Sequence, residues 1–194
     1  MTNNFLDRLF QKNLKTVFVI GGANSGKSEI AEKLSILLSE RIESNSKLYY
    51  VATAPLDWIR SDKEFETKVE LHRMRRKDMF ELIETGEDAR DLINFLNEDR
   101  YSLVDSVSTW LGLLNNDFQL QTDLVDVLKT RSKFTVLVSD EVGLSIHAEN
   151  ETANSYRENL GKLNQRISAV SDLTLLVVAG KTLILEDLFV AESN

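Results

Sequence analysis

The stretch from Val17 to Ala31 constrains this chain most, because an apolar run, a glycine-rich turn and a helical pattern follow one another in it. The turn carries every position that defines a phosphate loop, G-x-x-x-x-G-K-[ST]: Gly21, Gly26, Lys27 and Ser28. A phosphate loop requires a strand before it and a helix after it. Both flanks are present here, which favours nucleotide binding over a glycine-rich turn that binds nothing.

The residue types in this loop fit the chemistry of a polyphosphate. Glycines let backbone N–H groups face the phosphates at the positive end of the following helix. Lys27 can reach the β- and γ-phosphates, and the Ser28 hydroxyl can ligate Mg²⁺. The predicted nucleotide-binding loop comprises Gly21, Gly22, Ala23, Asn24, Ser25, Gly26, Lys27 and Ser28.

Apolar runs and amphipathic segments alternate along the rest of the chain. The pattern predicts strands at residues 17–20, 47–54, 80–84, 102–107, 134–139 and 173–179, the last taken as the final core strand. It predicts helices at residues 29–41, 62–77, 88–97, 120–130 and 151–170. Such alternation is typical of a mostly parallel sheet covered on both faces. The predicted fold is therefore an α/β, three-layer, phosphate-loop NTPase domain of the RecA-like kind.

Composition limits the other possibilities. The net charge of −8 argues against general binding to nucleic acid or to an anionic membrane surface. No apolar run is long enough for a membrane span, and the absence of cysteine is compatible with a cytoplasmic protein. Residues 1–15 have apolar side chains at helical spacing, so we expect a helical extension there and one catalytic domain over residues 16–194.

Two acidic positions follow predicted strands. Asp105 and the pair Asp140-Glu141 both stand where a phosphate-loop enzyme holds Mg²⁺. Either position could instead hold an acid that caps the next turn. Asp105, together with Ser28, is the preferred metal-binding pair, and Asp140-Glu141 stays open.

Two histidines are present, His72 and His147. His72 lies in a cationic segment with Arg73, Arg75 and Arg76, a setting suited to a polyphosphate but equally compatible with a solvated basic helix face. No role is assigned to His147.

Taken in order, these segments resemble the bifunctional adenosylcobinamide kinase/adenosylcobinamide-phosphate guanylyltransferase family of cobalamin biosynthesis. The resemblance runs from Gly21 to about Gly180. The family's GGARSGKS loop reads GGANSGKS here, its Y-I-A-T-A strand is residues 50–54, and its R-I-x-x-H-R-x-x-R box is residues 68–76. Its D-C-x-x-x-W, N-E-V-G-x-G-I and F-R-D-x-x-G-x-x-N-Q motifs match residues 105–110, 140–146 and 156–165. Asn24, Ser106 and Asp140 stand where the family has Arg, Cys and Asn.

The resemblance implies an enzyme with two activities. It would phosphorylate adenosylcobinamide with ATP or GTP, and then transfer GMP from GTP through a guanylyl-histidine to give adenosyl-GDP-cobinamide. It implies that His72 is the nucleophile and that Lys27 is catalytic. The implied nucleotide contacts beyond the loop are Ala52, Thr53, Ala54, Arg73, Met74, Arg75, Arg76, Glu84 and Asp105. The implied partners are nucleotide and corrinoid substrates, and the implied assembly is a homotrimer.

Two other hypotheses remain open at this point. The chain could be a diverged phosphate-loop kinase or nucleotidyltransferase that acts on another substrate. It could also be a nucleotide-binding regulatory or assembly subunit without turnover. A phosphate loop alone is shared by many functions, whereas the ordered set of motifs favours the bifunctional enzyme.

Overall fold

The computed structural model describes residues 13–42, 46–55, 79–114, 117–144 and 150–186. The predicted helix at residues 62–77 and most of the predicted extension at residues 1–15 lie outside these ranges. Within them, no helix is both long and apolar enough to cross a membrane.

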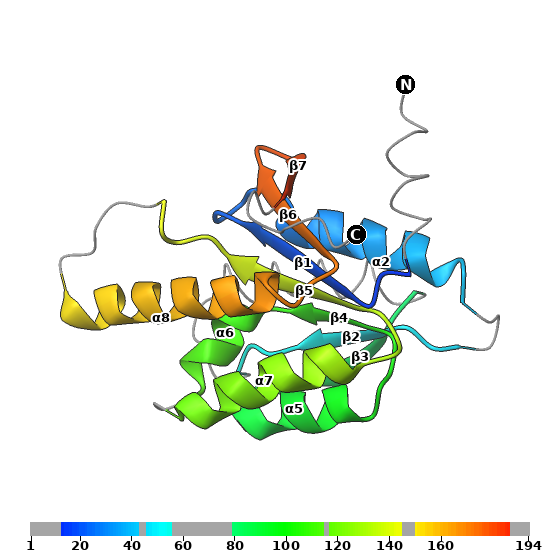
Figure 1. Ribbon diagram of the computed structural model, residues 1–194, viewed down its shortest axis with the longest axis horizontal. Helices are drawn as coiled ribbons and strands as arrows, with labels where there is room; N and C mark the ends of the chain where they lie inside the picture. The colour runs from blue at the N-terminus through cyan, green and yellow to red at the C-terminus, as the bar shows by residue number, and fades with distance from the viewer. Residues whose placement is uncertain (1–12, 43–45, 56–78, 115–116, 145–149, 187–194) are drawn as a thin grey trace, which may run out of the picture.

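A central sheet of seven strands organises the described part of the chain (Figure 1). Its order is β3-β2-β4-β5-β1-β6-β7, and every neighbouring pair is parallel except β6 and β7. The strands are β1 (Thr16–Gly21), β2 (Tyr49–Ala52), β3 (Glu81–Glu84), β4 (Ser102–Asp105), β5 (Thr135–Asp140), β6 (Leu173–Val178) and β7 (Lys181–Leu185). The predicted α/β, mostly parallel fold is confirmed.

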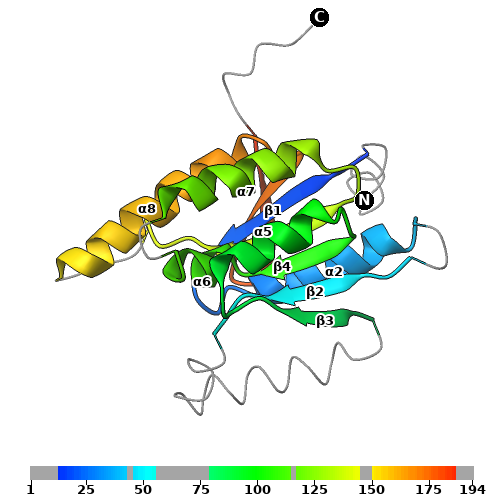
Figure 2. The same cartoon turned by 90° about the horizontal axis from the view of Figure 1, so that it is seen from below.

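Helices cover both faces of this sheet, which gives three layers (Figures 1 and 2). On one face lies α2 (Lys27–Ser39), which packs on alternate residues of the central strands such as Val19, Leu103 and Val138. The opposite face carries the other described helices: α5 (Ala89–Asn97), α6 (Val107–Gly112), α7 (Phe118–Thr130) and α8 (Glu151–Ser168). The central strands are buried on both faces, which explains their continuous apolar runs.

One detail of the sequence-based prediction is wrong, and one strand was not predicted. The strand expected at residues 102–107 ends at Asp105, because Ser106 leaves the sheet and caps the N-terminus of α6. The strand expected at residues 173–179 is β6 and is the last core strand, as predicted, but an exposed strand that was not predicted follows it, because the chain turns at Ala179 and Gly180 and returns as β7. Both turn residues have positive φ, 49° and 71°, as a tight hairpin turn requires. β7 is exposed along its length, although it contains the apolar residues Leu183, Ile184 and Leu185.

Parallel strands bring their carboxyl ends to one edge of the sheet, where ligands of open α/β folds bind. β1, β5 and β4 are consecutive neighbours, so the residues that follow them meet at that edge. Gly21 of β1 is directly opposite Asp140 of β5, and Asp105 of β4 is opposite Val138. The sheet order thus places two acidic side chains beside the phosphate loop.

Candidate active site

The phosphate loop, residues Gly21–Ser28, leaves β1 and enters α2 through backbone that only glycine tolerates well. A Cβ added at Gly21 would lie 2.5 Å from the carbonyl oxygen of Val177 on the neighbouring strand. Gly26 has a φ of 91°, in the left-handed region, and provides no side chain to cap α2. The first N–H groups of α2 therefore point into the loop without a side-chain partner from the N-cap residue, as an anion-binding helix end requires.

The β6–β7 turn supports this loop from the side. The backbone N–H of Gly180 donates to the carbonyl oxygen of Ser25 over 2.8 Å, and Gly180 lies against Gly26. Within the loop, the N–H of Ser25 donates to the carbonyl oxygen of Gly22 over 3.2 Å. The late hairpin, which the sequence pattern did not reveal, is thus part of the scaffold that fixes the loop.

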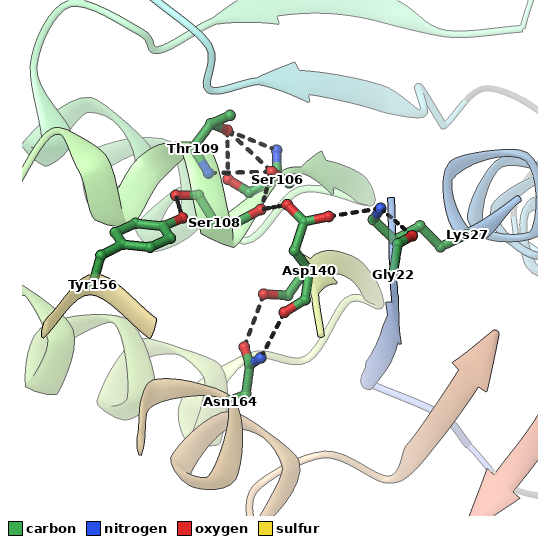
Figure 3. A network of polar contacts seen from close by, with 9 residues as sticks. Gly22, Lys27, Ser106, Ser108, Thr109, Asp140, Tyr156 and Asn164 are labelled. Atoms are coloured by element: carbon green, nitrogen blue, oxygen red, sulfur yellow. Dashed lines mark hydrogen bonds and ion pairs between the residues drawn. The ribbon is translucent and has the colours of Figure 1, made fainter. Parts of the chain in front are cut away.

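Lys27 and Asp140 form the central contact of the site (Figure 3). The Lys27 Nζ lies 2.7 Å from the Asp140 Oδ1 and donates over 3.2 Å to the carbonyl oxygen of Gly22. The Lys27 side chain is 12% exposed, so its charge faces the loop rather than bulk solvent. From the sequence, Asp140 could be either a metal-binding acid or an acid that caps a turn. The order of the strands, which the sequence does not reveal, places it against Lys27.

A network of polar contacts fixes Asp140 (Figure 3). Its other carboxylate oxygen, Oδ2, accepts from the Ser108 hydroxyl over 2.5 Å, and Ser108 shares a 2.7 Å hydrogen bond with Ser106. The Asp140 carbonyl oxygen accepts from the Asn164 amide over 3.0 Å. The Tyr156 hydroxyl donates to the carbonyl oxygen of Ser108 over 2.8 Å. Sequence reasoning did not select Ser108, Tyr156 or Asn164, although the last two lie in the matched 156–165 motif.

Tyr156 also lines a hollow of about 520 Å³ between α6, α7 and the first half of α8. Burial, with a smaller contribution from the charge of Asp140, raises the pKa of Tyr156 to about 12. The phenol therefore stays protonated at neutral pH and remains a hydrogen-bond donor to Ser108. The hollow is joined to the Asp140 network through this one side chain.

Asp105 ends β4 on the sheet face that α2 covers, as its alternation with Leu103 shows. Its Oδ2 accepts from the Tyr50 hydroxyl over 2.6 Å. Since Asp105 is opposite Val138, it lies two residues short of Asp140 along the strands, about 7 Å. Asp105 and Asp140 are thus on neighbouring strands at the edge where the phosphate loop begins.

These residues fit a bound Mg²⁺. The ion prefers oxygen ligands and commonly takes one or two carboxylates, with nucleotide phosphates and water completing the shell. Asp105, Asp140 and the Ser28 hydroxyl in the first turn of α2 offer that donor set. Among the residues that the structure describes, no group of three His, Cys, Asp or Glu side chains could hold a metal alone. A nucleotide would therefore have to supply part of the coordination shell.

The structure gives Thr53 a supporting role. Its side chain is fully buried, donates to the carbonyl oxygen of Ser106 over 2.7 Å and accepts from the Ser106 N–H over 2.9 Å. Ala52 lies in register between Asp105 of β4 and Glu84 of β3, so these three strand ends are level. Glu84 is exposed there. Among the remaining predicted site residues, His72 and 73–76 lie outside the described residues.

Comparison with protein families identifies the chain. The model of the family described as cobinamide kinase / cobinamide phosphate guanyltransferase matches residues 17–185. The chain belongs to this family. The matched region includes the phosphate loop, the two acidic strand ends and the α8 residues of the Asp140 network. The family resemblance found in the sequence is confirmed, and so is the expectation of an enzyme with kinase and guanylyltransferase activities.

Curated relatives agree with this assignment. The chain is 28% identical over 185 residues to the bifunctional adenosylcobalamin biosynthesis protein CobU of Escherichia coli, covering 84% of this chain and 96% of the relative. It is 31% identical over 169 residues to the bifunctional adenosylcobalamin biosynthesis protein CobP of Pseudomonas aeruginosa, covering 84% and 92%. The CobU protein of Salmonella typhimurium is 29% identical over 185 residues, with 84% and 96% covered.

Solved structures support the fold alone. A KaiC-like protein of Pyrococcus horikoshii superposes with a TM-score of 0.51 over 84% of this chain and 70% of its own. The sequence identity is 11%, so this likeness says nothing about substrate.

Proposed function

We propose that this chain phosphorylates adenosylcobinamide with ATP or GTP and then transfers GMP from GTP to the product, giving adenosyl-GDP-cobinamide. One observation carries the proposal: within the family match, Lys27 stands at the start of a helix whose N-cap residue has no side chain. A lysine at an uncapped helix start is an arrangement that binds polyphosphate. The curated relatives are named as bifunctional proteins of adenosylcobalamin biosynthesis.

For the first transfer, the loop residues Gly21–Ser28 hold the β- and γ-phosphates through backbone N–H groups and Lys27. The acceptor hydroxyl attacks the γ-phosphorus, the bond to the β-phosphate oxygen breaks, and the hydroxyl proton leaves. Catalysis here consists of positioning and of stabilising charge on the transferred group. Ser28 and Asp105 would hold Mg²⁺, which would neutralise charge on the phosphates. Asp140 is close enough to Lys27 to affect the same charge balance.

For the second transfer, a ring nitrogen of neutral His72 attacks the α-phosphorus of GTP, and pyrophosphate leaves. A phosphate oxygen of the cobinamide phosphate then attacks the same phosphorus, and the phosphorus–nitrogen bond breaks to release His72. We assign nucleotide contacts to Ala52, Ala54, Arg73, Met74, Arg75, Arg76, Glu84 and Asp105, whereas the fully buried Thr53 supports Ser106.

We further propose a domain organisation, a cellular location and an assembly for this chain. The catalytic domain spans residues 16–194 and residues 1–15 form a helical extension; in support, β1 begins at Thr16 and the family match at residue 17. The protein acts in the cytoplasm, where nucleotides are available. It assembles as a homotrimer, by analogy with the family, so that each site can be completed by a neighbouring copy.

The guanylyl-histidine can be tested directly with GTP radiolabelled at the α-phosphate. We expect the wild-type protein to acquire a label that is labile in acid and stable in alkali, as a phosphorus–nitrogen bond is. His72→Ala should lose at least about 99% of this label, whereas His147→Ala, the matched change at the other histidine, should retain it. Absence of label in all three proteins, with nucleotide binding intact, would favour a non-catalytic subunit. Phosphorylation of an acceptor other than adenosylcobinamide would indicate a diverged kinase.

A further inference from the structure

Asp140 presents a carboxylate to the lysine that should bind phosphate. The Lys27 Nζ lies 2.7 Å from Asp140 Oδ1 and also donates to the carbonyl oxygen of Gly22. In this arrangement the positive charge of Lys27 is paired with a carboxylate. A phosphate that binds Lys27 must therefore displace the Asp140 carboxylate or share the lysine with it.

The carboxylate is anchored and cannot easily turn away. Ser108 donates to its second oxygen over 2.5 Å, and the same serine is held by Ser106. The backbone of Asp140 is fixed by the amide of Asn164, whose oxygen in turn accepts from Ser139 over 2.8 Å. Register places Asp140 directly opposite Gly21, the first residue of the loop.

A nucleoside triphosphate carries about four negative charges, and bringing them beside an anchored carboxylate is unfavourable in a partly desolvated site. Asp140 is 34% exposed and Lys27 is 12% exposed, so solvent screens this repulsion only in part. A divalent cation on the phosphates would offset much of this repulsion, because it cancels part of their charge and the carboxylate can accept hydrogen bonds from water on the cation. The same carboxylate therefore disfavours bare nucleotide and tolerates the metal complex.

We propose that Asp140 is a specificity-determining residue that makes the phosphate loop select the magnesium complex of the nucleotide over the metal-free nucleotide. It does so by competing with the phosphates for Lys27 and by repelling phosphates that arrive without a cation. Asn stands at this position in the family motif that the sequence resembles, so this chain carries one more negative charge at the site. The inference rests on the proposed nucleotide binding by the loop.

The experiment measures the dissociation constant of a non-hydrolysable ATP analogue by calorimetry, once with Mg²⁺ and once with EDTA. The quantity of interest is the ratio of the EDTA value to the Mg²⁺ value. We expect Asp140→Asn to lower this ratio about tenfold, chiefly through tighter metal-free binding. Ser108→Ala keeps the charge but frees one carboxylate oxygen, and should lower the ratio less, in the same direction. Asp126→Asn removes an equal charge from the exposed face of α7 and should leave the ratio unchanged.

The outcomes are distinguishable. An unchanged ratio in folded Asp140→Asn, with wild-type binding intact, would overturn the inference and leave the proposed function standing. An equal fall in Asp126→Asn would also overturn it, because net charge would then suffice. Failure of the wild-type protein to bind the analogue under either condition would contradict the proposed function as well. Circular dichroism of each variant establishes folding before titration.

Discussion

The helices α2 and α6 begin at the same edge of the sheet, each directly after a parallel strand, yet their N-termini differ. At α6, Ser106 accepts from the N–H of Thr109 and the Thr109 hydroxyl accepts from the N–H of Ser106, so the helix start is closed by its own side chains. At α2, the N-cap residue is Gly26 and offers no side chain. The other described helices are capped by Asp88, Asp117 and Asn150.

This difference separates a structural helix end from a ligand-binding one. A capped end has satisfied its N–H groups and adds stability to the fold. An uncapped end keeps donors for an anion, and here it is followed at once by Lys27. The buried Thr53 adds to the stability of the α6 start, because its hydroxyl forms hydrogen bonds with the backbone of Ser106. Mutations at the uncapped start of α2 should therefore change nucleotide affinity, and mutations of the α6 cap and of its buried support Thr53 should change stability.

The largest effect is expected at Lys27. Lys27→Ala removes the charged donor to the phosphates, and we expect nucleotide affinity to fall at least about 100-fold, about 2.7 kcal/mol. The free energy of unfolding should fall by only about 1 kcal/mol, because the loss is limited to one ion pair with a part-exposed carboxylate and one hydrogen bond. Calorimetry and urea unfolding measure the two quantities. Lys33→Ala, an exposed lysine on the same helix paired with Glu29, is the control and should retain affinity.

A smaller effect is expected at Thr53, on the free energy of unfolding rather than on nucleotide affinity. Thr53→Val keeps the shape of this buried side chain but leaves the Ser106 backbone groups without its hydroxyl, which should cost about 1–3 kcal/mol of unfolding free energy. The same substitution at exposed Thr130 should stay within about 0.5 kcal/mol. Urea unfolding of both variants provides the comparison. If Thr53→Val kept full stability and lost only nucleotide affinity, Thr53 would belong to the ligand-binding side.

The phosphate loop could be predicted from the sequence, but the partner of its lysine could not. The phosphate loop is a local motif, so its strand, turn and helix could be recognised from adjacent residues. The partner of Lys27 could not be chosen, because Asp105 and Asp140 look alike in sequence and only the order of strands decides which one lies opposite Gly21. That order arises from long-range packing between β1 and β5 rather than from local pattern.

Two other features escaped prediction for physical reasons. β7 contains three apolar residues, Leu183, Ile184 and Leu185, but they are exposed, and so short a run does not distinguish a strand from a loop. Ser108 and Tyr156 are joined by a hydrogen bond between α6 and α8, across 48 residues of sequence. A single serine or tyrosine in a sequence does not predict such a contact. The matched 156–165 motif was the available signal for Tyr156 and Asn164.

The most direct test of the account is whether one lysine serves both transfers. The same preparations of wild type, Lys27→Ala and Lys33→Ala are assayed with γ-labelled ATP and adenosylcobinamide, and with α-labelled GTP and adenosylcobinamide phosphate. We expect Lys27→Ala to lose both activities by at least about 100-fold, and Lys33→Ala to keep both. Full kinase activity in folded Lys27→Ala would contradict the central claim that the uncapped end of α2 holds the transferred phosphate.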